Sequence, residues 1–145
     1  MNLIVVGTDG SPTATEAVRK AIELAKQNGG RLAVVSAYKP LAGARIVGAG
    51  SSAEAQEWQD GLSDSKVEAV LRDAATIARS EGVEIETHRR KGDPADAILE
   101  VAKEQDADLI VVGNQGMTGA RRVLGSVPNK ITHHAPCSVM VVRTG

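Results

Sequence analysis

Short apolar runs alternate along the chain with longer segments whose apolar residues recur at helical spacing. Four of the runs, at 3–6, 32–38, 108–112 and 138–142, are rich in β-branched residues and typical of buried strands in a parallel sheet. A fifth, at 83–88, alternates apolar and polar residues, so we expect that strand near an edge of the sheet. The pattern therefore predicts five strands.

Four segments between these strands are predicted to be helices. The first begins at Ser11-Pro12, because serine caps a first turn and proline fits the first helical position. Gly92-Asp93-Pro94 repeats this arrangement before a helix that runs to about Glu104, and the other two helices are expected at 65–80 and 126–134. The apolar positions of the first two helices are Ala14, Ala17, Val18, Ala21, Ile22 and Ala25, and Val67, Val70, Leu71, Ala74, Ile77 and Ala78.

The alternation of strands and helices predicts a single α/β domain over residues 1–145, a doubly wound five-stranded parallel sheet with helices on both faces. We favour the strand order 3-2-1-4-5, which places the topological switch point between the first and fourth strands. Residues 39–63 break the pattern, since they carry glycine and serine without a clear period. We expect a flexible excursion there, with a short helix near 53–58, that forms a flap beside the site.

Composition narrows the class of protein further. The formal net charge is −1 without a cationic block, which speaks against a nucleic-acid partner. Trp58 and Tyr38 are the only aromatic residues, so the core must be built from valine, isoleucine, leucine and alanine. The single cysteine, Cys137, excludes an internal disulfide. With no targeting segment and no apolar stretch long enough for a membrane span, we expect a cytoplasmic protein.

Glycines mark the candidate site. Gly113-Asn114-Gln115-Gly116 follows the fourth strand, and Gly125-Ser126-Val127-Pro128 comes eight residues later, at the start of a helix. Such a loop exposes backbone N–H groups, and a helix N-terminus favours an anion. Ligands of open α/β sheets bind at the carboxyl ends of the strands, where residues 7–10 would flank the same crevice. The sequence therefore predicts a nucleotide site.

Each of these features also has a purely structural explanation. The loop glycines could serve only to supply positive φ angles in a tight turn. Asp9 could form an Asx-type turn with the backbone that follows it. Arg121-Arg122, just before Gly125, could pair with phosphate oxygens or form a solvated charge pair.

Three motifs together resemble the universal stress protein family. They are Val6-Gly7-Thr8-Asp9-Gly10-Ser11, Gly92-Asp93-Pro94 and the loop at 113–127, and the resemblance extends over residues 3–142. It implies a stress-response protein with the doubly wound fold that commonly forms homodimers. Many members bind ATP through a pattern of Gly, two residues, Gly, nine residues, then Gly and Ser or Thr.

The resemblance also implies roles for individual residues. Gly113 and Gly116 would line the ribose and phosphates, while Gly125 and Ser126 would hold the phosphates. Asp9 would lie near the ribose and adenine, and Ala37 would contact the adenine edge through its backbone. The full nucleotide-binding set is Gly7, Thr8, Asp9, Ala37, Gly113, Asn114, Gly116, Met117, Arg122, Gly125, Ser126 and Val127.

One departure from the family pattern bears on the ligand. Eight residues separate Gly116 from Gly125, where the pattern has nine, and this shifts Ser126 relative to the phosphates. ATP, with Mg²⁺ accompanying its phosphates, is the first expectation. AMP and cyclic AMP are the alternatives.

The chain shows no constellation typical of catalysis. It has no paired carboxylates, no nucleophile beside a base, no metal-ligand cluster, and no P-loop lysine to act on the β- and γ-phosphates. We therefore expect a nucleotide-binding regulatory protein rather than an enzyme. The alternatives are a slow ATP hydrolase using Asp9 and Ser126, and an interaction protein without nucleotide. The apolar last strand, 138–142, has a free edge and is predicted to pair in a homodimer.

Overall fold

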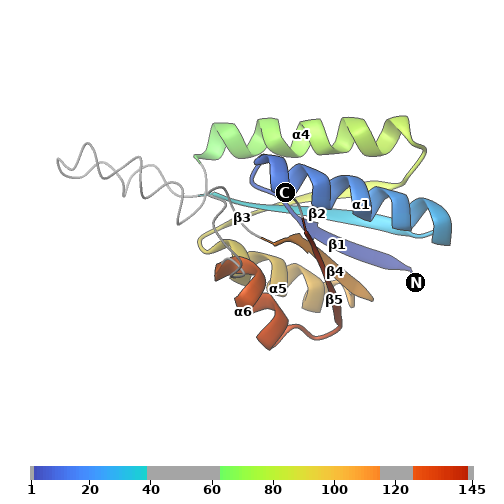
Figure 1. Cartoon of the computed structure of the whole chain (residues 1–145). Coiled ribbons are helices and arrows are strands. Elements are labelled where there is room, and N and C mark those ends of the chain that lie inside the picture. Colours follow the sequence, from blue (N-terminus) through green and yellow to red (C-terminus); the bar gives the residue numbers. More distant parts are fainter. Residues whose placement is uncertain (1, 39–62, 115–125, 144–145) are drawn as a thin grey trace.

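The computed structural model describes residues 2–38, 63–114 and 126–143. Five parallel strands form one sheet in the order β3-β2-β1-β4-β5, and helices lie on both of its faces (Figure 1). The predicted fold class and strand order are confirmed. The elements, in chain order, are β1 (Leu3–Gly7), α1 (Pro12–Asn28), β2 (Arg31–Tyr38), α4 (Asp64–Ser80), β3 (Ile85–Lys91), α5 (Pro94–Glu104), β4 (Leu109–Gly113), α6 (Ser126–His134) and β5 (Ser138–Val142).

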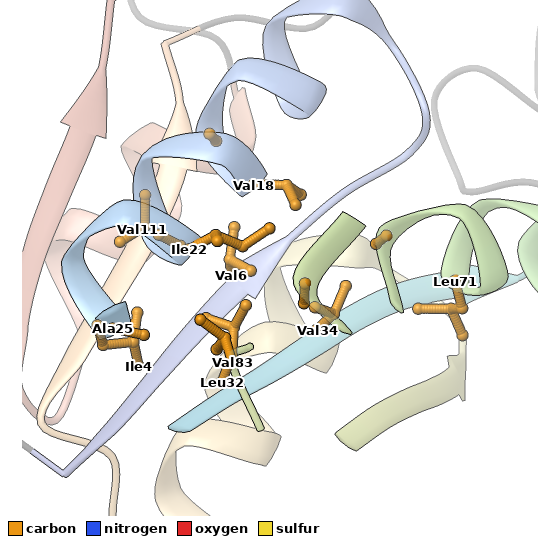
Figure 2. Packing of buried hydrophobic residues seen from close by; sticks show 14 of the residues in the cluster. Ile4, Val6, Val18, Ile22, Ala25, Leu32, Val34, Leu71, Val83 and Val111 are labelled. Atoms are coloured by element: carbon orange, nitrogen blue, oxygen red, sulfur yellow. The ribbon is translucent and has the colours of Figure 1, made fainter. Parts of the chain in front are cut away.

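One apolar core lies on each face of the sheet. Helices α1 and α4 pack on one face, where Val6 of β1 and Ile22 of α1 point toward each other (Figure 2). Helices α5 and α6 pack on the other face, around Val5, Ile98 and Ile131. Because β1 is buried on both faces, every side chain along it is apolar up to its terminal glycine. The buried hydrophobic residues are all valine, isoleucine, leucine or alanine in the described part of the chain, as the composition predicted.

The two predicted helix starts are formed as expected. The Ser11 hydroxyl accepts a hydrogen bond from the Ala14 N–H at 3.2 Å, with proline following in the first turn. The Asp93 carboxylate accepts one from the Asp96 N–H at 3.0 Å, again before a proline. Each cap satisfies a backbone donor that the first helical turn leaves unpaired.

The bounds predicted for one strand were wrong. The third strand is Ile85–Lys91 rather than 83–88, because the Val83 N–H bonds to Ala78 O at the end of α4, whereas Lys91 still pairs with Tyr38 of β2. In α1, the apolar position Ala14 is half-buried and its neighbour Thr13 is buried. The predicted edge position of this third strand is confirmed. The excursion predicted at 39–63 lies outside the described residues except for Ser63.

Asp108 ties the amino ends of two neighbouring strands together. Its Oδ2 accepts hydrogen bonds from the backbone N–H groups of Leu3 at 3.0 Å and Asn2 at 2.7 Å. These bonds, that of Leu3 first, lower the pKa of the Asp108 carboxyl in the folded protein.

We predict that Asp108 makes stability pH-dependent. A pKa lower in the folded than in the unfolded state stabilises the fold above the unfolded value, about 4, and this contribution is lost as pH falls through the folded-state value. Asp108→Asn should therefore unfold more easily than the wild type at neutral pH, with the difference shrinking in acid. Urea denaturation from pH 7 to 3 tests this, and Asp73→Asn, at an exposed site in α4, is the control. A difference that does not depend on pH would contradict the account.

Candidate functional site

The carboxyl ends of β1 and β4 lie side by side at the switch point of the sheet. Val6 pairs with Val111, so both strands end at the same edge, in Gly7 and Gly113. The chain leaves β1 toward α1 on one face, and the helix that follows β4, α6, lies on the other (Figure 1). The predicted convergence of these two glycine-bearing strand ends is confirmed, and this edge is where open α/β sheets bind ligands.

The turn after β1 is held by hydrogen bonds of ordinary length. The Thr8 N–H donates to Val35 O at 3.0 Å, and Thr8 Oγ1 accepts from the Gly10 N–H at 3.0 Å. Asp9 Oδ1 accepts from the Ser11 N–H at 2.9 Å, so Asp9 does form the Asx-type turn. The Asp9 side chain is exposed, and its second oxygen has no partner among the described residues. The turn therefore leaves part of this carboxylate available to a ligand.

The two strand-end glycines lie in close contact with the helices that cover them. A Cβ built on Gly7 would lie 2.9 Å from Ile98 Cγ1 of α5, and one on Gly113 would lie 3.0 Å from the carbonyl oxygen of Thr13 in α1. Gly113 does not have a positive φ, so the turn explanation for it is wrong, whereas Gly10 has a φ of 83°. Sequence reasoning missed this packing role, because nothing in the pattern shows which helix approaches a strand end.

The end of β2 contributes backbone rather than side chains. Ala37 is buried against α5, so its predicted role would fall to its backbone groups. Ser36 beside it is also buried, and its hydroxyl donates to Thr8 O at 2.7 Å. The sequence offered no sign of this contact, since a lone serine in an apolar strand has no motif around it.

The residues beyond β4 are only partly described. The Asn114 N–H donates to Val142 O at 2.8 Å, which joins the end of β4 to the end of β5. At the start of α6, Ser126 is exposed and Val127 packs against the second core. The remaining predicted residues, Gly116, Met117, Arg122 and Gly125, lie outside the described residues.

Two cations close to this edge, Lys130 and Arg89, have acidic partners. Nζ of Lys130, in α6, lies 2.9 Å from Asp96 Oδ1 and 3.5 Å from Asp93 Oδ2, and these carboxylates raise the pKa of Lys130. Arg89 pairs with Asp64 and lies over the Tyr38 ring. Within residues 2–38, 63–114 and 126–143, no three metal-ligating side chains come together. Around the turn after β1, the described residues therefore offer a ligand backbone N–H groups and the Asp9 carboxylate.

Comparison with known sequences identifies the family. The family described as "Universal stress protein family" matches residues 1–143. The universal stress protein MJ0531 of Methanocaldococcus jannaschii is 36% identical over 141 residues, covering 97% of this chain and 81% of that protein. The universal stress protein Rv1636 of Mycobacterium tuberculosis is 35% identical over 151 residues, covering 97% of this chain and 95% of that protein.

Solved structures agree with this assignment. A universal stress protein in complex with cAMP is 34% identical with a TM-score of 0.75, covering 99% of this chain and 98% of that one. The universal stress protein of Archaeoglobus fulgidus in complex with dAMP is 26% identical with a TM-score of 0.65, covering 97% of this chain and 96% of that one. With a family match over nearly its whole length, the chain belongs to the universal stress protein family.

Proposed function

We propose that this chain is a stress-response regulatory protein that binds an adenine nucleotide between the carboxyl ends of β1 and β4. The observation that carries the proposal is the meeting of these two strand ends, Gly7 and Gly113, at the switch point. Relatives of the same fold that are 34% and 26% identical have been solved with cAMP and dAMP, which supports an adenine nucleotide as the ligand class.

The proposed roles follow the geometry of the edge. The Asp9 carboxylate, held at one oxygen by the Ser11 N–H, accepts hydrogen bonds from the ribose hydroxyls with the other. The backbone of Ala37 contacts the adenine edge, because its side chain is buried. Gly113 and Ser126 lie toward the phosphates, where the N-terminus of α6 favours an anion. Gly116, Met117, Arg122 and Gly125 complete the proposed phosphate contacts from outside the described residues.

ATP is the nucleotide that the glycine pattern indicates, with Mg²⁺ entering on its phosphates. Asp9 alone does not supply enough ligands for that ion, because Mg²⁺ prefers several oxygen ligands in octahedral geometry. Cyclic AMP is the second candidate, since the loop between Gly116 and Gly125 is one residue short and a relative 34% identical is known with cAMP. AMP has the same nucleoside and remains the third.

We further propose that the nucleotide is a regulatory ligand and not a substrate. Among the described residues, Asp9 bonds only to backbone and no second titratable side chain contacts it, so it lacks the partner that a general base uses. A slow hydrolase is the competing function. Sustained ADP release that Asp9→Ala abolishes would support hydrolysis and contradict a pure binding role.

Asp9→Ala should weaken nucleotide binding about tenfold or more, because a hydrogen bond to a charged group contributes about 1.5–3 kcal/mol. Asp9→Asn keeps an acceptor for the Ser11 N–H and should lose less affinity. Calorimetric titration measures both, and Asp73→Ala, at an exposed aspartate of α4, is the matched control. Equal affinity of Asp9→Ala and Asp73→Ala would remove Asp9 from the site.

The proposed assembly is a homodimer that pairs through β5. This strand ends the described sheet and has β4 as its neighbour, and its residues Val139 to Val142 remain half-buried in the single chain. An apolar edge strand is a ready template for pairing with a second copy. Sedimentation at micromolar concentration should give a dimer, and a monomer there would contradict this proposal.

A cytoplasmic location is part of the same proposal. Cys137 is half-buried, and its burial raises the pKa of the thiol, which keeps it protonated and poorly reactive. A lone, unreactive thiol suits a reducing compartment. No helix in the described ranges is long and apolar enough to cross a membrane.

A further inference from the structure

Ser36 is a buried polar residue in an otherwise apolar strand. It lies in β2 between Val35 and Ala37, with 2% of its surface exposed. Its hydroxyl donates a 2.7 Å hydrogen bond to the carbonyl oxygen of Thr8, the first residue after β1. The bond therefore joins the ends of two neighbouring strands at the edge where the candidate site lies.

Thr8 is held at each of its polar groups. Its N–H donates to Val35 O, its carbonyl accepts from Ser36, and its Oγ1 accepts from the Gly10 N–H. In the described residues, Ser36 is the one side chain of another strand that takes part in these bonds. The adjacent Asp9 closes the turn by accepting from the Ser11 N–H. The turn that carries Asp9 is therefore joined to the end of β2 by one backbone bond, to Val35, and by one buried side-chain hydroxyl, that of Ser36.

We propose that Ser36 is a positioning residue, which sets the distance between Asp9 and the backbone of Ala37 and so adjusts the site to the nucleoside part of its ligand. This inference rests on the nucleotide-binding function proposed above. Alanine would fit at this position, but it would leave the carbonyl of buried Thr8 without its donor, so the stability of each variant is measured beside its affinity. The role of the hydroxyl is to hold the Thr8 carbonyl, and through it the turn.

The test compares Ser36→Ala with Ser36→Thr, which keeps a hydroxyl. Calorimetry with AMP, cyclic AMP and ATP should show Ser36→Ala weakened by about five- to tenfold, the value of one hydrogen bond. The loss should be similar for AMP and ATP, because they share both ribose hydroxyls and differ only in phosphate. Cyclic AMP keeps the 2′ hydroxyl alone, because its phosphate is bonded to the 3′ oxygen, and its loss should be no larger. Ser36→Thr should restore most of the affinity. Val34→Ala, two residues earlier on the same face of β2, loses buried methyl groups without losing the bond and should stay within about twofold of the wild type.

A double variant tests the route through the turn. If Ser36 acts by placing Asp9, then Ser36→Ala should cost little further affinity in an Asp9→Ala background. The amide NMR signals of Gly10 and Ser11 should also shift in nucleotide-free Ser36→Ala and stay in place in Val34→Ala.

Four results would overturn the proposal, and they separate it from the proposed function. Unchanged affinity in Ser36→Ala, full additivity with Asp9→Ala, or a folded Ser36→Thr that does not recover affinity would each overturn the role of Ser36 while leaving nucleotide binding intact. A wild-type protein that binds none of the three nucleotides would overturn the proposed function and this proposal with it.

Discussion

Replacing Gly113 by alanine is expected to lower the free energy of unfolding by about 2–3 kcal/mol, the upper part of the usual range for overpacking a tight contact. The new Cβ would lie 2.5 Å from Cγ2 of Thr13, 3.0 Å from its carbonyl oxygen and 3.2 Å from its carbonyl carbon. The last two atoms belong to the backbone of α1, so rotation of the Thr13 side chain would relieve only the first contact. Either β4 or the first turn of α1 must move.

Gly7→Ala provides a matched comparison at the end of the neighbouring strand. The Cβ added there meets Cγ1 and Cδ1 of Ile98, the flexible end of a side chain, so the cost should be smaller. Ile98→Val removes Cδ1 and should recover part of the loss caused by Gly7→Ala. Urea denaturation of the three variants measures this order. A Gly113→Ala protein as stable as the wild type would show that α1 does not press on the end of β4.

Gly113→Ala should also weaken nucleotide binding. Movement of the first turn of α1 displaces Ser11, whose N–H holds Asp9, and so disturbs the turn after β1. We expect Gly113→Ala to lose affinity even at temperatures where it is fully folded. Titration well below its melting temperature separates this effect from unfolding.

Ile131→Ala is expected to cost about 3 kcal/mol of unfolding free energy, within the range for truncating a buried isoleucine to alanine. Ile131 is fully buried and is, with Pro128, one of the two buried residues of α6. The ion pair of Lys130 with Asp96 is exposed and contributes little by comparison. The packing of α6 on the sheet therefore depends on its buried apolar side chains, Ile131 above all in size, and not on this ion pair.

Thr132→Ala, at the next position, is the control. Thr132 is exposed and its hydroxyl bonds only to Asn129 O within the same helix, so we expect a change below about 0.5 kcal/mol. Because α6 begins with Ser126 and Val127 of the proposed site, Ile131→Ala should also reduce nucleotide affinity. A cost for Ile131→Ala as small as that for Thr132→Ala would contradict the packing of α6 described above.

Local patterns in the sequence were sufficient to predict the fold class and the order of the strands. Unbroken apolar runs such as the one in β1 predict central strands, and Ser11-Pro12 predicts the start of α1 because capping depends only on neighbouring residues. The limits of β3 were predicted less well, because pairing of Lys91 with Tyr38 extends the strand beyond its alternating part. Pairing is a property of two strands, and one strand's pattern does not contain it.

The sequence indicated where the candidate site lies, but not the contacts that hold its residues. Gly7 and Gly113 at two strand ends, together with the strand order, were enough to locate it. The Ser36–Thr8 bond and the contact of Gly113 with Thr13 join residues far apart in the chain. Whether such contacts form depends on interatomic distances that differ by a few tenths of an ångström. Such contacts depend on how the finished layers pack, which periodicity and spacing do not describe.

The central claim is that an adenine nucleotide binds where β1 and β4 end. The most direct test is calorimetric titration of the nucleotide-free protein with ATP, AMP and cyclic AMP, each with and without Mg²⁺, alongside the Asp9→Ala variant. We predict saturable binding of at least one of the three, weakened about tenfold or more in Asp9→Ala. If none of the three binds, the central claim is contradicted, and if the variant binds as tightly as the wild type, Asp9 at the end of β1 is not part of the nucleotide site.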